Sequence, residues 1–113
     1  MKYAIFGDVH SNLEALQAVL EDARGQDVTH YACLGDIVGY NADPQACMQA
    51  IRDLNCKTVR GNHDHYCSHD ENLSGFQPLA AEVVDWTRHQ LTPDEREYLR
   101  SLPMVERVET EYE

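Results

Sequence analysis

The amino-acid sequence predicts an α/β fold that begins with a β-α-β-α-β unit around a parallel sheet. Three short apolar runs, residues 3–6, 28–34 and 57–59, have the composition of buried strands, and each leads into a glycine-containing turn. The segments between them carry apolar residues at helical spacing. Each is long enough to cross over from one parallel strand to the next, as a βαβ unit requires.

The two crossover helices have recognisable starts. The first is expected to begin at Ser11, which forms the capping-box pattern S-x-x-E with Glu14, and to end at Gly25. The second is expected to begin with Asp43 as N-cap and Pro44 at the first helical position. The apolar faces would consist of Leu13, Leu16, Val19, Leu20 and Ala23 in the first helix and Cys47, Met48, Ile51 and Leu54 in the second.

Beyond the third strand the pattern changes. Residues 65–77 are polar and predict a loop, and residues 78–91 predict a helix with Leu79, Val83 and Trp86 on one side, Trp86 being a core residue. A second capping box, Thr92 to Glu95, predicts a helix that runs to about residue 102 and stops before proline. Alternating polar and apolar residues from 104 to 112 predict a further strand.

Composition limits the classes of function. A chain of 113 residues with 42% hydrophobic and 26% charged content fits one globular domain, residues 1–113. We expect a cytoplasmic protein, because the sequence has no signal-peptide pattern and no apolar run near the roughly 20 residues that span a bilayer. The net charge of −11 disfavours binding to a nucleic-acid backbone, which requires Lys and Arg to neutralise phosphates.

The four cysteines are expected to be reduced thiols, most of them buried. They are Cys33, Cys47, Cys56 and Cys67, and no two form a C-x-x-C pair of the kind found in zinc knuckles and redox motifs.

The same event occurs at the end of each predicted strand: glycine is followed by a side chain that can bind a metal. The three stretches read G-D-V-H, G-D and G-N-H-D, and they supply Asp8, His10, Asp36, Asn62 and His63. The carboxyl ends of parallel strands face one crevice, so we expect these groups to converge there. A single Gly-Asp is usually only a turn, but three in register separated by crossover-length segments predict a metal site.

The donor set indicates which metal and which chemistry. Two carboxylates, an imidazole and an amide oxygen suit Mn²⁺ first, with Fe, Zn²⁺ or Ni²⁺ as alternatives. Asp36, on the central loop, is placed to bridge two divalent ions, which could together hold a hydroxide nucleophile and clamp a phosphoryl group. His63 would reach the same crevice and could stabilise developing charge or protonate the leaving oxygen. Tyr40 and Asn41 either line a substrate pocket or are turn residues.

The blocks GDVHSN, GDIVGY and GNHD resemble the first three signature blocks of the calcineurin-like metallophosphoesterase superfamily. Residues 76–103, with F-x-P-L-A-A, W-T and L-T-P-x-E-R-x-Y-L-x-S-L-P, resemble its bacterial phosphodiesterase or diadenosine-tetraphosphatase-like branch. The resemblance implies an αββα sandwich with a dinuclear centre that hydrolyses small phosphate esters or nucleotides. It assigns Asp8, His10 and Asp36 to the first metal, Asp36 and Asn62 to the second, and catalysis to His63.

The sequence departs from the family pattern in two places. Many relatives have an aspartate three positions after the bridging aspartate that orients the catalytic histidine; here the position is Gly39, and Asp64 or Asp43 could substitute. The later H-G and G-H-x-H blocks, which supply further metal-binding histidines in the family, are absent from these residues. We therefore expect the chain to be the N-terminal part of a longer protein, truncated before the second sheet is complete.

Three other interpretations remain open at this point. The chain could be a non-catalytic metal- or nucleotide-binding remnant, because four ligand groups leave two ions under-coordinated. Two copies could associate as a homodimer that completes the sheets. A Rossmann-like nucleotide site is disfavoured, because no G-x-G-x-x-G follows the first strand.

Overall fold

A computed structural model describes residues 1–110 of the chain and shows a three-stranded parallel sheet with five helices. The elements in chain order are β1 (Tyr3–Phe6), α1 (Leu13–Gly25), β2 (His30–Cys33), α2 (Pro44–Leu54), β3 (Lys57–Thr58), α3 (Asn62–Ser68), α4 (Pro78–Gln90) and α5 (Pro93–Ser101). The strand order is β1-β2-β3, so each strand pairs with its successor in the chain. The register places Tyr3 opposite His30 and Phe6 opposite Cys33.

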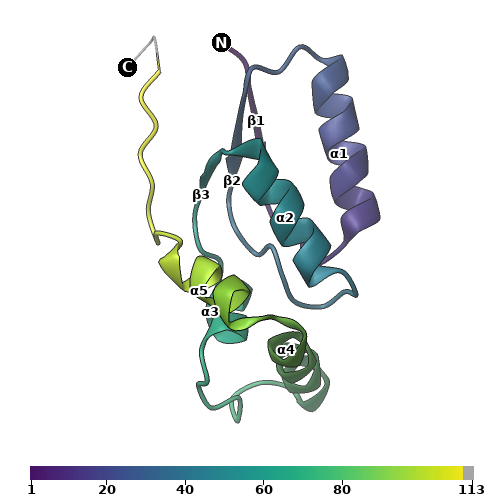
Figure 1. The fold of residues 1–113 in the computed structure, drawn as a ribbon, viewed down its shortest axis with the longest axis vertical. Coiled ribbons are helices and arrows are strands. Elements are labelled where there is room, and N and C mark those ends of the chain that lie inside the picture. The colour runs from purple at the N-terminus through teal and green to yellow at the C-terminus, as the bar shows by residue number, and fades with distance from the viewer. Residues whose placement is uncertain (111–113) are drawn as a thin grey trace.

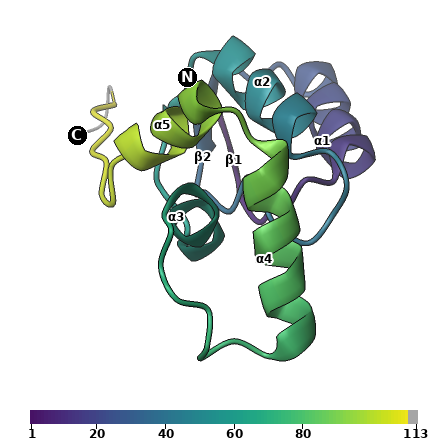
Figure 2. The same cartoon turned by 60° about the horizontal axis from the view of Figure 1, so that its bottom comes forward.

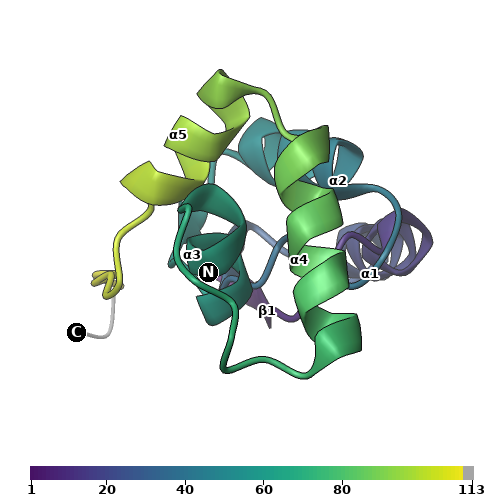
Figure 3. The same ribbon diagram turned by 90° about the horizontal axis from the view of Figure 1, so that it is seen from below.

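The predicted β-α-β-α-β unit is confirmed. Helices α1 and α2 are its crossovers and pack against each other, while α3, α4 and α5 gather beyond the carboxyl ends of the strands (Figure 1). Turning the molecule brings this second group forward and shows α3 beside both α4 and α5 (Figure 2). The view from below shows the three helices across the end of the sheet (Figure 3). They stand where the strand-end loops carry the predicted ligands.

The core lies between the sheet and the helices. Phe6 packs against it, whereas its neighbour Ile5 is 65% exposed, because successive strand residues point to opposite faces. The buried cluster consists of Val9, Leu16, Leu20, Cys33, Ile37, Val38, Cys47, Met48, Ile51, Cys67, Val84, Leu91, Leu99 and Leu102. All four cysteines are free thiols, as predicted.

The start of α1 differs from the prediction by one residue. The N-cap is Asn12, whose Oδ1 accepts a hydrogen bond from the Ala15 N–H at 3.1 Å, and the predicted cap Ser11 lies outside the helix. Ser11 has φ +59° and donates its N–H to the Ile37 carbonyl at 2.8 Å. This hydrogen bond to the second loop holds Ser11 outside the helix, so Asn12 is the N-cap.

The starts of α2 and α5 agree with their sequence signals. Pro44 opens α2 after Asp43, although the Asp43 side chain makes no capping hydrogen bond. At α5 the capping box is complete: Thr92 Oγ1 accepts from the Glu95 N–H at 3.2 Å, and Glu95 Oε1 accepts from the Thr92 N–H at 2.8 Å.

The prediction of a loop over residues 65–77 is wrong at its beginning, because a helix already starts at Asn62. In α3, Asp64 occupies the third position and accepts the N–H of Gly61 at 3.0 Å, which stabilises the first turn. The G-N-H-D stretch, expected in a loop, is thus the N-terminal turn of a helix.

The predicted strand over residues 104–112 is not formed in the part of it that is described, and residues 111 and 112 lie outside the described residues. Residues 104–110 run alongside the sheet without entering its ladder (Figure 1). The one ion pair from this segment to β3 joins Lys57 Nζ and Glu106 Oε1 at 4.0 Å. Polar alternation favours a strand only where a neighbour supplies ladder hydrogen bonds.

The predicted side of α4 is also wrong. Leu79 is 72% and Trp86 43% exposed, and the helix instead buries Val84 and Thr87. Among the described residues, no helix has the length and apolar character needed to cross a membrane.

Candidate metal centre

The loops after β1 and β2 are joined by backbone hydrogen bonds. The Asp8 N–H donates to the Gly35 carbonyl at 3.2 Å, and the His10 N–H donates to the Asp36 carbonyl at 2.8 Å. These bonds continue the parallel pairing of the strands beyond the sheet. As a result, the side chains of Asp8, His10 and Asp36 emerge at one place, as the sequence predicts.

These three side chains form a compact donor group. His10 Nε2 lies 3.8 Å from Asp8 Oδ1 and 4.0 Å from Asp36 Oδ2. One ligand atom from each residue lies within 4.8 Å of the other two. The Asp8 side chain is 83% exposed, while that of Asp36 is 17% exposed, so the group opens to solvent on the Asp8 side. One nitrogen and two carboxylate oxygens at these separations can coordinate a divalent cation between them.

The orientation of His10 is set by its other ring nitrogen. Nδ1 lies 3.1 Å from the carbonyl of Val38, which can only accept, so Nδ1 carries the proton. In the neutral ring, Nε2 would then offer its lone pair, and this nitrogen is directed toward the two carboxylates. A backbone carbonyl commonly holds a metal-binding histidine in this way. This carbonyl could not be predicted from the residue types, because any residue at position 38 could supply it.

Asn62 lies on the other side of the Asp36 carboxylate. With its nitrogen turned toward that carboxylate, the amide is 3.1 Å from Oδ1 and 3.2 Å from Oδ2. Turning the amide over would present its oxygen at the same place, where it could share a cation with Asp36. Gly61 makes this approach possible, because a methyl group there would overlap Asp36 Oδ1 and the Asp36 backbone nitrogen.

His63 completes the group of predicted residues. Its backbone N–H donates to Asp36 Oδ1 at 3.0 Å. Its ring lies edge-on to the His10 ring, with centroids 4.9 Å apart. Burial lowers the pKa of the His63 imidazole, although the Asp36 carboxylate acts in the opposite direction. The neutral form is thereby favoured at neutral pH.

No described residue orients the His63 ring by a hydrogen bond to Nδ1, which is buried and without a partner. Gly39 takes the place of the expected aspartate, and a Cβ atom there would lie 2.9 Å from Nδ1. The ring is therefore held by packing against Gly39 and by the ring of Tyr40, whose centroid lies 4.6 Å away.

The suggestion that Asp64 or Asp43 orients His63 is wrong for this structure. Both oxygens of Asp64 are used by the backbone: Oδ2 accepts the N–H groups of Asp36 at 2.8 Å and Gly61 at 3.0 Å. Oδ1 accepts the next two N–H groups of the second loop, at 2.8 and 3.3 Å. Burial raises the pKa of the Asp64 carboxyl to about 6, although these N–H groups act in the opposite direction.

Asp64 is therefore a clamp between the second and third loops, a role that the sequence analysis missed. The available signal was its place at the third position of a helix, where carboxylates accept backbone N–H groups. The clamp fixes the backbone at Asp36 and at Gly61, next to Asn62, and so holds these two predicted ligand residues close together.

Tyr40 and Asn41, predicted either to line a substrate pocket or to be turn residues, lie in the loop after β2 and line cavities there. Asn41 Nδ2 donates to the His10 carbonyl at 2.9 Å and so ties the second loop to the first. The Tyr40 ring contacts the His10 ring, with centroids 4.8 Å apart. Tyr40 and Asn41 each line the same two cavities, which adjoin at these residues.

The loops hold an unusual backbone conformation. Seven described non-glycine residues have positive φ, and five of them lie in these loops: Asp8, His10, Ser11, Asp36 and Tyr40. Such conformations cost about 1 kcal/mol each or more and concentrate at functional sites. Their clustering supports a site whose geometry is imposed by the surrounding hydrogen bonds.

A comparison with protein families identifies the family of the chain. The calcineurin-like phosphoesterase family matches residues 1–112. The chain belongs to this family. The resemblance of GDVHSN, GDIVGY and GNHD to its signature blocks is thus confirmed, and so is the α/β fold class.

Individual relatives support the assignment. An uncharacterised protein of Methanocaldococcus jannaschii is 44% identical over 102 residues, which are 90% of this chain and 42% of the relative. The crystal structure of a metallophosphoesterase from Sphaerobacter thermophilus has a TM-score of 0.76 and 43% identity, and the match covers 91% of this chain and 42% of that one.

Two further solved structures share the fold. A hypothetical protein from Pyrococcus horikoshii has a TM-score of 0.78 and 27% identity over 89% of this chain and 47% of its own. A candidate diadenosine tetraphosphatase has a TM-score of 0.67 over 89% of this chain and 42% of its own; at 22% identity this likeness concerns the fold alone. The chain therefore spans less than half the length of these relatives.

Proposed function

We propose that the chain contributes to the metal-dependent hydrolysis of phosphate esters, either mono- or diesters. The observation that carries the proposal is the group of Asp8, His10 and Asp36, whose ligand atoms lie within 4.8 Å of one another at the strand ends of a calcineurin-like fold. In this proposal these three residues hold a first divalent cation, and Asp36 and Asn62 hold a second.

The residues fit such a centre chemically. A mixed set of carboxylate, imidazole and amide donors suits Mn²⁺ first, and Fe, Zn²⁺ or Ni²⁺ as alternatives. Two bound cations would supply Lewis-acid polarisation of the phosphoryl group and activation of a water nucleophile. Asp8 and Asp36 would repel a phosphate unless cations neutralise them, so substrate binding should require metal.

His63 is the proposed catalytic residue. Its Nδ1 faces Gly39, which leaves Nε2 as the nitrogen that can reach a bound ester. An N–H at Nε2 would stabilise charge on the phosphoryl oxygens or give its proton to the leaving oxygen. Tyr40, whose ring contacts both His10 and His63, would border the bound substrate.

The test is hydrolysis of 4-nitrophenyl phosphate and bis(4-nitrophenyl) phosphate by purified protein loaded with Mn²⁺. Asp36→Ala should abolish turnover, because it removes a ligand common to both proposed ions. His63→Ala should lower kcat by about 100-fold or more while metal binding persists. The matched control is Glu21→Ala, an exposed carboxylate on α1 away from the donor group. Turnover in Asp36→Ala equal to that of the control would refute the proposal.

A second candidate is a non-catalytic metal-binding role. It is favoured by the presence of a single group of three His, Cys, Asp or Glu donors among residues 1–110. Metal analysis separates the two candidates. Two ions per chain with turnover support the esterase, whereas one ion without turnover supports the binding role.

A further inference from the structure

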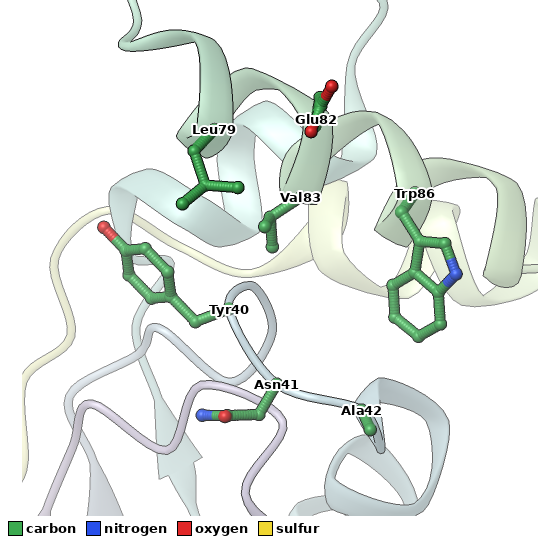
Figure 4. A pocket seen from close by; sticks show the side chains of 7 residues that line it. All are labelled: Tyr40, Asn41, Ala42, Leu79, Glu82, Val83 and Trp86. Carbon is green, nitrogen blue, oxygen red and sulfur yellow. The ribbon is translucent and has the colours of Figure 1, made fainter.

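The face of α4 that the sequence predicts to be core borders an open cavity. Leu79, Val83 and Trp86 line its upper side and face the 40–42 loop across it (Figure 4). The cavity has a volume of about 600 Å³, within the roughly 300–1,000 Å³ range of small-molecule sites. Leu79 is 72% exposed and Trp86 43% exposed, so an apolar helix face is presented to solvent here.

Tyr40 connects this cavity to the candidate metal centre. Its side chain lines the cavity, and its ring centroid lies 4.8 Å from that of His10 and 4.6 Å from that of His63. A molecule with its phosphoryl group between the metal ligands would therefore need to pass only the Tyr40 ring to place its remaining part in the cavity.

The lining indicates what kind of group would fit. Leucine, valine, tryptophan and tyrosine side chains offer apolar and aromatic surface, and flat rings stack favourably on Trp and Tyr. Glu82 is the one charged residue among those lining the cavity. Its carboxylate points away from the 40–42 loop (Figure 4), and no basic side chain is among the lining residues to bind another phosphate. A neutral ring is therefore the matching occupant.

We propose that the cavity between α4 and the 40–42 loop is a subsite for the flat aromatic group of a phosphate ester. This inference rests on the proposed function, because it places the phosphoryl group at the metal centre. Trp86 stacks on the ring, Leu79 and Val83 pack against it, and Tyr40 lies between ring and phosphoryl group. An aryl ester and a nucleotide both present such a group, and the experiment distinguishes them.

The experiment compares 4-phenylbutylphosphonate with butylphosphonate. The four-carbon linker allows the ring to pass Tyr40, and the carbon–phosphorus bond resists ester hydrolysis, so binding is read without turnover. Zn²⁺ is used because it is diamagnetic. Two nuclear magnetic resonance signals are followed: the ³¹P signal of the ligand, which reports the metal centre, and the indole N–H of Trp86, which is a single peak because the chain has one tryptophan.

We expect 4-phenylbutylphosphonate to bind about 10-fold more tightly than butylphosphonate and to shift the Trp86 indole signal, which butylphosphonate should leave in place. Tenfold corresponds to about 1.4 kcal/mol, within reach of one stacked and buried ring. Trp86→Ala should reduce the affinity for 4-phenylbutylphosphonate to that for butylphosphonate. Leu79→Asn, at a more exposed position, is the second variant if Trp86→Ala does not fold. The control is Val105→Ala, an apolar residue that is 84% exposed outside the cavity.

Equal affinities with an unmoved indole signal would overturn the subsite while leaving the metal proposal intact, because the ³¹P signal would still respond. No binding of either phosphonate in the presence of Zn²⁺ would overturn both. An indole signal that shifts with protein concentration alone, and not with ligand, would assign the cavity to a second copy of the chain and overturn the subsite. 9-(4-Phosphonobutyl)adenine, compared with the same butylphosphonate, identifies the source: a larger gain than for phenyl supports a nucleobase, a smaller one a simple aryl group.

Discussion

Gly39 shows how one residue can shape the site without taking part in its chemistry. It stands where many relatives have the aspartate that orients the catalytic histidine, and it has φ +92°. A side chain at this position would press on the His63 ring, and L-residues rarely adopt this backbone conformation. The His63 ring is thus held by close packing instead of a hydrogen bond to Nδ1.

Gly39→Ala should destabilise the fold by about 1–2 kcal/mol and lower turnover, because it adds backbone strain and a methyl group 2.9 Å from His63 Nδ1. Urea unfolding and ester hydrolysis are the measurements. Gly75→Ala is the matched control, since no atom lies within 4 Å of the added methyl group and its φ is not in the left-handed range. Equal effects of the two variants would contradict the role given to Gly39.

Buried thiols give a second prediction at this scale. Burial raises the pKa of Cys33 to about 12, that of Cys67 to about 12 and that of Cys47 to about 11. At pH 8 these thiols should be protonated and unreactive, so Ellman's reagent should label only the half-buried Cys56 in the folded protein. Labelling of more than one thiol per folded chain would count against the packing described.

The same shifts make stability depend on pH in the alkaline range. The folded-state pKa values lie above the ordinary thiol value of 9.0, so the unfolded chain loses these protons first. The contribution of these thiols to stability should therefore be constant below about pH 9 and fall above it, by about 1.4 kcal/mol per thiol for each further pH unit. Urea unfolding at pH 8 and pH 10 measures this, and Cys67→Ala should reduce the difference by one thiol's share.

At the scale of elements, the starts of α2 and α5 and the ends of the strands were predictable because they depend on local chemistry. The capping box of α5 and the proline at the start of α2 are properties of four or five consecutive residues. The start of α3 and the exposed side of α4 were not predictable. Asp64 stabilises the start of α3 by accepting N–H groups from the second loop as well as from its own turn. An amphipathic helix face is buried only where another element packs against it, and the sequence pattern of the helix does not show where that element lies.

Thr92→Ala should lower the free energy of unfolding by about 1 kcal/mol, because the Glu95 N–H loses its acceptor at the start of α5. Thermal and urea unfolding measure the loss. Thr92→Ser keeps a hydroxyl oxygen at the cap and should restore most of the stability. If the serine variant is as unstable as the alanine variant, the contribution of Thr92 is packing and not capping.

At the scale of the whole molecule, the three loops meet only because the sheet brings distant segments together. Two carboxylates then lie near His10 in a chain of net charge −11, which favours uptake of a cation. Binding of a metal to the folded state alone would shift the unfolding equilibrium, so the proposed centre has a consequence for stability as well as for catalysis.

Mn²⁺ at about 100 times its dissociation constant should stabilise the fold by about 2.7 kcal/mol, and excess chelator should remove the gain. The midpoint of urea unfolding, measured with and without Mn²⁺, checks this. Asp36→Ala should show no gain, whereas Glu21→Ala should respond as the wild type does. A gain of the same size in Asp36→Ala would place the bound ion elsewhere.

The sequence by itself determined the α/β class, the order of the elements through β3 and the identity of the five converging side chains. Each of these follows from local periodicity and from residues that directly follow a strand. Only the tertiary structure decided that Val38 orients His10, that Asp64 clamps two loops and that the apolar side of α4 faces a cavity. Each of these depends on backbone groups or open space supplied by segments far away in the chain. Spacing along the sequence carries no information about such partners, whereas folded proximity does.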